Sequence, residues 1–452
     1  MPIENFTLLL RFGISLFVYL FATMGISRLS LAEQARVKTL FKNEDSDAAR
    51  WWLLEQAKKR VYLQTYILEL DETGKAYLGK LMQLARRGVD VHLMVDGRGS
   101  HHFSGANRDY LQLLADAGVD VVQFNPLSVR RLHQAFGANH DKFIVSDYLH
   151  CNVDGRNISN SESRSGNQAS VDVGMLIESK FMNQALVNVF QMERDRSFNR
   201  VFSAKLSDER RVELTRELET IRLNHEKLPH ISAPVSTNPF SGTHVTNADI
   251  VNSPSRFHTP RFNLIREKFL KLVESSNKEI VIQNAYVVMT PETEQALQRA
   301  AQRGVRIILH TNSLVTAKGT GLPEMAFEAY WQHLLKNVPN IEIYTSSVAG
   351  THLHSKAFVF DSKVAMVGSY NLDGLSDWAN SEVVAVVEDE TISRRIRRNI
   401  VVEAIERSFL HTAHGRLSMD DKIPDPNDSC FELSSYFARH VGKIANWFAP
   451  IL

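Results

Sequence analysis

Two stretches of the sequence share one pattern: His140-Asp-Lys-Phe-Ile-Val-Ser-Asp147 and His354-Ser-Lys-Ala-Phe-Val-Phe-Asp361. In each stretch a lysine follows the histidine at the second position and an aspartate follows it at the seventh. In a chain of ordinary composition, about 0.06 matches to this spacing are expected by chance. Two copies therefore indicate an internal duplication, which the surrounding sequence should share.

The segments before the two motifs repeat one order of elements. In each half the sequence predicts an apolar strand, an amphipathic helix that ends at a glycine, Gly88 or Gly304, and a second strand. The predicted elements are residues 61–67, 78–87 and 89–95 in the first half and residues 280–286, 292–303 and 305–310 in the second. The sequence therefore predicts an α/β protein built from two duplicated units.

A segment rich in Pro, Ser, Thr and Asn separates the two units. Residues 228–262 contain five prolines and are predicted to form a linker or a long surface loop. The first domain then covers residues 33–227, and the second covers residues 263–415. Residues 416–452 form a C-terminal tail whose apolar residues recur at helical spacing, which predicts an amphipathic helix lying on a membrane or docked on the protein's own core.

The N-terminal segment, residues 1–32, contains an uncharged apolar run over residues 12–26. This run is shorter than the roughly 20 residues that a membrane crossing needs. Its length suits a signal peptide, and the alternatives are an uncleaved membrane anchor and a buried core helix. The first two readings place the protein at a membrane of a cell envelope.

Composition narrows the choice of partners and cofactors. The formal net charge is +1 and the pI is near 7.9, so no global electrostatic attraction to nucleic acid is expected. The two cysteines, Cys151 and Cys430, are too few for a disulfide framework and lack metal-ligand spacing. We therefore expect no metal, no cofactor and no nucleic-acid partner.

Strand geometry predicts how each motif presents its side chains. His and Lys at positions i and i+2 of a strand project from one face. A two-residue turn after each motif would pair His354 with Asn371 and Lys356 with Ser369 across a hairpin. The same rule pairs His140 with Asn157 and Lys142 with Gly155. Each half would then offer a histidine, a lysine and an asparagine in one cluster.

Such clusters suit a two-step displacement at phosphorus. One imidazole attacks and forms a phosphohistidine, while the other protonates the leaving alkoxide and later deprotonates the incoming alcohol or water. Lysines and asparagines hold the phosphate oxygens. The candidate catalytic residues are His140, Lys142, Asp147, His354, Lys356 and Asp361, and the candidate substrate-binding residues are Asn157, Ser369 and Asn371.

Each histidine also needs a partner that fixes its tautomer. The downstream carboxylates Asp172 and Glu382 are the candidates for this orienting role. Asp147 and Asp361 follow apolar runs where turns are predicted, so we expect them to organise the local backbone and the lysines and not to touch phosphate. No metal is required by this chemistry.

These residues resemble the phospholipase D superfamily with two HKD motifs and, within it, bacterial cardiolipin synthases of the C type. The resemblance covers roughly residues 48–409. Besides the paired motifs it rests on Gln64-Thr-Tyr66, Asp71-Glu-Thr-Gly74, Asp154-Gly-Arg-Asn157, Thr311-Asn-Ser-Leu314 and Gly368-Ser-Tyr-Asn-Leu-Asp373. It implies two α/β/α domains, each with a central mixed β-sheet, and an active site at their interface.

The resemblance also implies a reaction, in which a phosphatidyl group moves from phosphatidylglycerol or phosphatidylethanolamine to phosphatidylglycerol and gives cardiolipin. It implies that His140 is the nucleophile and His354 the acid and base, with phospholipids and a membrane surface as partners in a bacterial cell envelope. Two positions depart from the family's pattern: Asp154 replaces a glycine, and Gly374 stands where relatives often have proline.

Three other functions compete with this reading. A phospholipase D would hydrolyse the same intermediate and release phosphatidic acid. A lipid-binding or effector protein would keep the fold with vestigial catalysis, although both motifs are complete. A nuclease of the same superfamily is disfavoured by the near-neutral charge and the apolar N-terminus.

Overall fold

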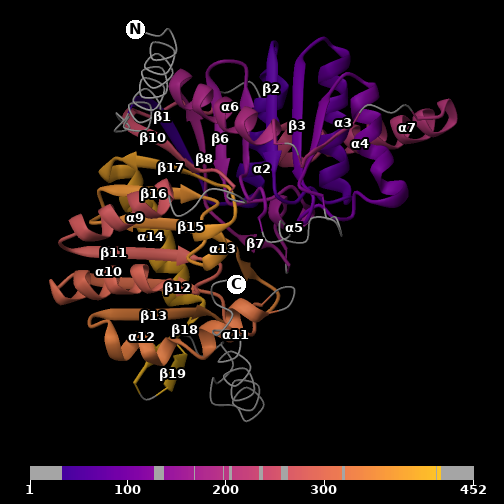
Figure 1. Cartoon of the computed structure of the whole chain (residues 1–452). Helices are drawn as coiled ribbons and strands as arrows, with labels where there is room; N and C mark the ends of the chain where they lie inside the picture. Colours follow the sequence, from indigo (N-terminus) through magenta and orange to yellow (C-terminus); the bar gives the residue numbers. More distant parts are fainter. Residues whose placement is uncertain are drawn as a thin grey trace, which may run out of the picture.

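A computed structural model describes residues 33–126, 137–166, 168–196, 198–202, 206–233, 238–255, 263–317, 321–413 and 415–418. The chain forms two halves of similar construction, the first coloured indigo to magenta and the second orange to yellow in Figure 1. Their strands join in one mixed sheet through β1 and β10, which pair antiparallel. The α/β class and the duplication predicted from the sequence are confirmed.

The first half orders its strands as β9-β4-β3-β2-β5-β6-β8-β1. Strands β2, β3 and β4 run parallel, whereas β5, β6 and β8 form an antiparallel meander. The strands are β1 (Glu33–Leu40), β2 (Arg60–Thr65), β3 (Asp90–Asp96), β4 (Asp120–Phe124), β5 (Phe143–Ser146), β6 (His150–Asp154), β8 (Gly174–Glu178) and β9 (Arg200–Val201). The main helices are α2 (Asn43–Gln56), α3 (Glu72–Arg86), α4 (Arg108–Asp116) and α6 (Lys180–Arg194).

The second half repeats this order as β18-β13-β12-β11-β15-β16-β17-β10, with β19 added at the outer edge. The strands are β10 (Val245–Ser253), β11 (Glu279–Asn284), β12 (Arg306–Thr311), β13 (Ile341–Ser346), β15 (Lys356–Phe360), β16 (Val364–Gly368), β17 (Glu382–Glu388), β18 (Ser408–Thr412) and β19 (Gly415–Ser418). The helices are α9 (Leu264–Ser275), α10 (Pro291–Gln302), α11 (Leu322–Glu328), α12 (Trp331–Asn337), α13 (Gly374–Trp378) and α14 (Glu390–Glu406).

Alternate residues of each strand enter different hydrophobic cores, which explains the layered construction. Ile280 and Ile282 of β11 pack with α9, α10 and α12, whereas Val281 packs with α14 on the opposite face. The core around Val281 also contains Phe190 of α6 and Ala248 of β10, so it spans both halves. The two halves are therefore held together by one continuous core layer as well as by the sheet.

The glycine caps predicted at the ends of the first long helix of each half are present. Gly88 and Gly304 adopt φ of 84° and 89°, in the left-handed region that a helix C-cap requires. Helix α3 begins at Glu72, earlier than the predicted residue 78, because the Asp71 side chain accepts a hydrogen bond from the Gly74 N–H at 2.9 Å.

The hairpin register predicted after each motif is wrong by one residue. Phe360 pairs with Val364 and Ser146 pairs with His150, so each turn contains three residues and not two. Asp361 and Ser362 adopt left-handed backbone conformations, with φ of 52° and 56°, which non-glycine residues rarely do. The directly opposed pairs His354 with Asn371 and His140 with Asn157 are therefore not formed.

The segment 228–262, expected to be a linker, contains regular structure. Helix α8 (Pro229–Ser232) packs in the first half, and β10 (Val245–Ser253) pairs with β17 of the second half. The strand was missed because five of its nine residues, Thr246, Asn247, Asp249, Asn252 and Ser253, are polar. Helix α7 (Asp208–His225) precedes this segment and packs on α3.

The predicted N-terminal segment of residues 1–32 lies outside the described residues, as does the tail from residue 419 onward. The first three residues of the expected tail belong to β19. Within the described ranges, no helix is both long enough and apolar enough to cross a membrane.

Candidate active site

His140 is held by a carboxylate from the other half of the chain. Its Nδ1 lies 2.9 Å from Oε2 and 3.0 Å from Oε1 of Glu382, which is fully buried at the start of β17. The backbone fixes this approach, because the His140 N–H donates to the carbonyl of Ser381 at 3.1 Å. With Nδ1 engaged, Nε2 is the ring nitrogen left for chemistry.

His354 repeats the arrangement with the halves exchanged. Its Nδ1 lies 2.8 Å from Oδ2 of Asp172, and its backbone N–H donates to the carbonyl of Val171 at 2.7 Å. The short strands β7 (Ser170–Val171) and β14 (His352–Leu353) pair in parallel beside it. Each half therefore supplies one histidine and the carboxylate that orients the other half's histidine, so the centre exists only where the halves meet.

Both motif lysines are buried and anchored next to their histidines. Lys142 Nζ donates to the His140 carbonyl at 2.6 Å, and Lys356 Nζ donates to the His354 carbonyl at 2.5 Å. Burial, and then the charge of Lys356, lowers the pKa of Lys142 to about 7, and burial also lowers the pKa of Lys356. Two desolvated ammonium groups that destabilise each other gain most from a bound phosphate.

The three candidate substrate-binding residues differ in the hydrogen bonds that their side chains already make. Asn157 donates to Glu162 at 3.1 Å and accepts from the Ile67 N–H at 3.0 Å. Ser369 donates to Glu382 at 2.5 Å, so it supports the carboxylate of His140. The carboxamide oxygen of Asn371 is buried and has no hydrogen-bond partner among the described residues. This open position is an acceptor, so only the Nδ2 group of Asn371 could donate a hydrogen bond to a phosphate oxygen.

Asp147 and Asp361 hold the backbone before β2 and β11. Asp361 accepts hydrogen bonds from the N–H groups of Asn277, Lys278 and Glu279 at 2.8 to 3.0 Å. Asp147 accepts from the equivalent groups of residues 58–60 at 2.7 to 3.1 Å. Both aspartates were expected to be catalytic and to orient the lysines. The hydrogen bonds of both carboxylates go to backbone groups. These turn contacts explain why an aspartate occupies the same place in both repeats.

The Asp361→Asn variant is expected to lose stability without losing its active-site geometry. Burial raises the pKa of Asp361, but the three backbone N–H groups outweigh it and lower the pKa overall. The carboxylate therefore stabilises the fold above its unfolded pKa, and this contribution disappears as pH falls through the folded pKa. We expect a loss of about 1–2 kcal/mol in the free energy of unfolding at pH 7, measured by denaturant titration. A loss that stays constant down to pH 2 would contradict this role.

The electrostatics of the two histidines differ. Burial lowers the pKa of His140 to about 4, while its partner Glu382 has a lowered pKa because His140, Lys142 and Ser369 together outweigh burial. At the other histidine, burial raises the pKa of Asp172 to about 8 and lowers that of His354. The surroundings of Glu382 therefore favour its ionised form, whereas Asp172 and His354 form a pair able to hold an extra proton.

Tyr66 is a residue near His140 that pattern reasoning did not assign to the site. Its ring meets the His140 imidazole edge-on at 4.9 Å between centroids and lies 5.3 Å from Lys142 Nζ. These contacts limit how the imidazole can turn. Its position directly after β2 was a signal, since active-site residues of parallel strands gather at their carboxyl ends.

Comparison with known proteins identifies the family of this chain. The family model described as "Cardiolipin synthase, PLD-like domain" matches residues 52–194 and 269–401. The chain belongs to this family. The two matched ranges coincide with the two halves of the fold, so the duplicated domains are phospholipase D-like, and the chain is an enzyme of the phospholipase D type.

Relatives and solved structures agree with this membership. The chain is 25% identical over 407 residues to cardiolipin synthase C of Escherichia coli, covering 80% of this chain and 83% of the relative. It is 27% identical over 355 residues to cardiolipin synthase B of Salmonella typhi, covering 77% and 75%. The phosphatidylserine synthase of Haemophilus influenzae superposes with a TM-score of 0.67 at 15% identity, over 93% of this chain and 98% of that one. This last likeness shows the shared fold.

Proposed function

We propose that the protein is a phosphatidyltransferase that makes cardiolipin from phosphatidylglycerol and a second phospholipid through a phosphohistidine intermediate. The observation that carries this proposal is the pair of histidines, each with Nδ1 held by a buried carboxylate of the opposite half. The family membership supports phospholipids as the substrates. A vestigial binding protein is disfavoured, because both histidine–carboxylate pairs are complete and buried.

In the first step, Nε2 of His140 attacks the phosphorus of the donor lipid. The bond from phosphorus to the headgroup oxygen breaks, and His354 gives the departing alkoxide a proton. Lys142, Lys356 and the Nδ2 group of Asn371 donate to the non-bridging oxygens while negative charge accumulates on them. The products are phosphatidyl-His140 and a free headgroup alcohol.

In the second step, the hydroxyl of an acceptor phospholipid attacks the phosphatidyl-His140. His354 takes the proton of that hydroxyl, the nitrogen–phosphorus bond breaks, and His140 is regenerated. If water replaces the lipid hydroxyl, the same steps release phosphatidic acid. The choice of acceptor therefore decides between transferase and hydrolase.

The test is incubation of the purified full chain with labelled phosphatidylglycerol in detergent micelles, followed by chromatographic separation of the lipids. Cardiolipin and released glycerol support the proposal. Phosphatidic acid as the sole product would establish a hydrolase instead. Sedimentation of the full chain with vesicles of phosphatidylglycerol tests the proposed association with a membrane surface of the bacterial envelope.

Chelators are expected to leave the activity unchanged. The site supplies positive charge to the phosphate through Lys142 and Lys356, and the proton transfers need only the two histidines. EDTA at millimolar concentration should therefore change the initial rate by less than about twofold. A chelator-dependent loss that Zn²⁺ or Mg²⁺ restores would show that a metal takes part.

A further inference from the structure

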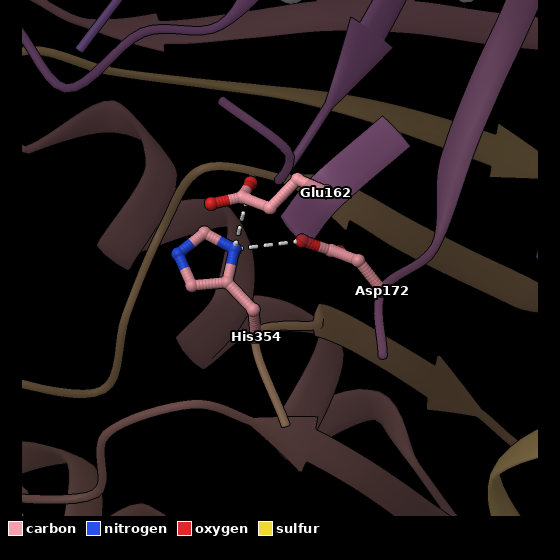
Figure 2. A group of neighbouring side chains, drawn as sticks. All are labelled: Glu162, Asp172 and His354. Carbon is pink, nitrogen blue, oxygen red and sulfur yellow. Dashed lines mark hydrogen bonds and ion pairs between the residues drawn. The ribbon is translucent and has the colours of Figure 1, made fainter. Parts of the chain in front are cut away.

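His354 faces two carboxylates, whereas His140 faces one. Besides Asp172 at 2.8 Å, Oε2 of Glu162 lies 3.7 Å from Nδ1 of His354, and single ligand atoms of the three residues lie within 4.8 Å of one another. Figure 2 shows Nδ1 turned towards both carboxylates and the other ring nitrogen pointing away from them. Glu162 is outside every motif that the sequence singled out.

The internal repeat shows that this second carboxylate is specific to one half. Glu162 follows Asn157 at the fifth position, and the residue at the fifth position after Asn371 is Ser376. Ser376 Oγ donates to Glu382 at 2.6 Å. The same position of the fold thus carries a neutral donor beside His140 and a carboxylate beside His354.

A second difference between the two repeats also distinguishes the surroundings of Asp172 from those of Glu382. Ser369 donates to Glu382, but its counterpart is Gly155, where a Cβ atom would lie 2.5 Å from a carboxylate oxygen of Asp172. The glycine therefore lets Asp172 approach and removes the hydroxyl that would stabilise its charge. Both differences favour an added proton on the Asp172 side of the centre and an ionised carboxylate on the Glu382 side.

Glu162 is fixed in place and borders solvent. Its carboxylate accepts hydrogen bonds from the backbone and side-chain N–H groups of Asn157. It also lines a cleft of about 630 Å³ together with Ile67, Ser159 and Arg164, and its side chain is 10% exposed. Glu162 therefore lies at the edge of the site, whereas Asp172 is buried inside it.

Other charged groups act on the pair from several elements. The charged and titratable groups facing His354 are Lys356, His352, Lys142 and His140, and those facing Asp172 are Arg156, Lys356, Asp154 and Glu162. The positive groups favour loss of a proton, and the carboxylates favour its retention. Arg156 and the lysines already balance the negative charge, so we assign no metal to this cluster.

We propose that Glu162 is a positioning residue that keeps an extra proton on the Asp172–His354 pair, from which His354 delivers it to the leaving alkoxide. In the first step this proton leaves Nε2 of His354 and the headgroup alcohol is released. In the second step the proton of the acceptor hydroxyl returns to Nε2. Glu162 takes part in neither proton transfer. This inference rests on the proposed two-step transfer.

The test compares two donors in the Glu162→Gln variant. Phosphatidylglycerol has an alkoxide leaving group that needs a proton, whereas bis(4-nitrophenyl) phosphate releases nitrophenolate, which needs little help. We expect the variant to keep the nitrophenolate burst and to lose about tenfold in glycerol release at pH 8. The alkaline limb of the lipid pH profile should move about one unit lower, because removing a negative neighbour favours loss of the proton.

Two further variants separate positioning from folding. Glu162→Asp should restore most of the lipid activity and the position of the alkaline limb. Glu69→Gln is the matched control, since Glu69 borders the same cleft and is half-exposed, and its nearest histidine is His102. This control variant should leave the rates with both donors and the pH profile unchanged.

The outcomes separate this inference from the proposed function. Equal losses with both donors, or an unmoved alkaline limb in a folded Glu162→Gln protein, would overturn the role of Glu162. If wild-type protein turns over the nitrophenyl ester but makes phosphatidic acid in place of cardiolipin, the proposed transferase fails, yet glycerol release still tests Glu162.

Discussion

The His140→Ala variant is expected to lose turnover of phosphatidylglycerol by about 10⁴-fold or more. The substitution removes the nitrogen that forms the covalent bond, and the other described side chains bonded to Glu382 are the hydroxyls of Ser369 and Ser376, which donate to it. Since the intermediate cannot form, covalent labelling by phosphorus-labelled lipid should disappear together with turnover. Steady-state kinetics and gel detection of the label measure the two effects.

The control for this variant is His101→Ala. His101 is exposed, and among the described residues its side chain bonds only to the Arg98 carbonyl, so its loss should leave rate and labelling unchanged. Persistent labelling of a folded His140→Ala protein would mean that another residue is the nucleophile.

The Glu382→Gln variant is expected to lose about 10³-fold in the rate of intermediate formation. The carboxylate accepts from His140, Ser369 and Ser376 and so keeps the His140 proton on Nδ1, which leaves the Nε2 lone pair free. A carboxamide can present its NH₂ group to Nδ1, and the proton then moves to Nε2, where it blocks attack. Stopped-flow measurement of the nitrophenolate burst reports this step directly.

Glu388→Gln provides the matched comparison, because Glu388 lies at the exposed end of the same strand, β17. It should change the burst rate by less than about twofold. If Glu382→Gln stays within about tenfold of wild type while remaining folded, the orienting role of Glu382 is wrong.

Local sequence patterns predicted much of the fold, but they did not predict how the two halves pair. The period of apolar residues predicted β2, α3 and β3 and their counterparts, since these elements bury one face or both. The spacing between His and Lys predicted two lysines beside two histidines. That Glu382 would serve His140 and Asp172 would serve His354 depends on how the halves dock, which no local pattern contains.

The errors have local physical causes. The hairpin register failed because Asp147 and Asp361 adopt the left-handed backbone conformation, which is uncommon outside glycine. Their carboxylates stabilise those turns by accepting hydrogen bonds from backbone N–H groups. Strand β10 was hidden by its polar residues. Glu162 was overlooked because it lies among serines and asparagines that are typical of a loop, although aligning it with Ser376 through the repeat would have singled it out.

The central claim is that catalysis proceeds through a phosphatidyl group on Nε2 of His140. The most direct measurement is acid-free quenching of the full chain during turnover of phosphorus-labelled phosphatidylglycerol, followed by proteolysis and mass spectrometry of the labelled peptide. The account predicts an acid-labile, alkali-stable label on the peptide that contains His140. A label on the peptide containing His354, or turnover without any covalent label, would contradict it.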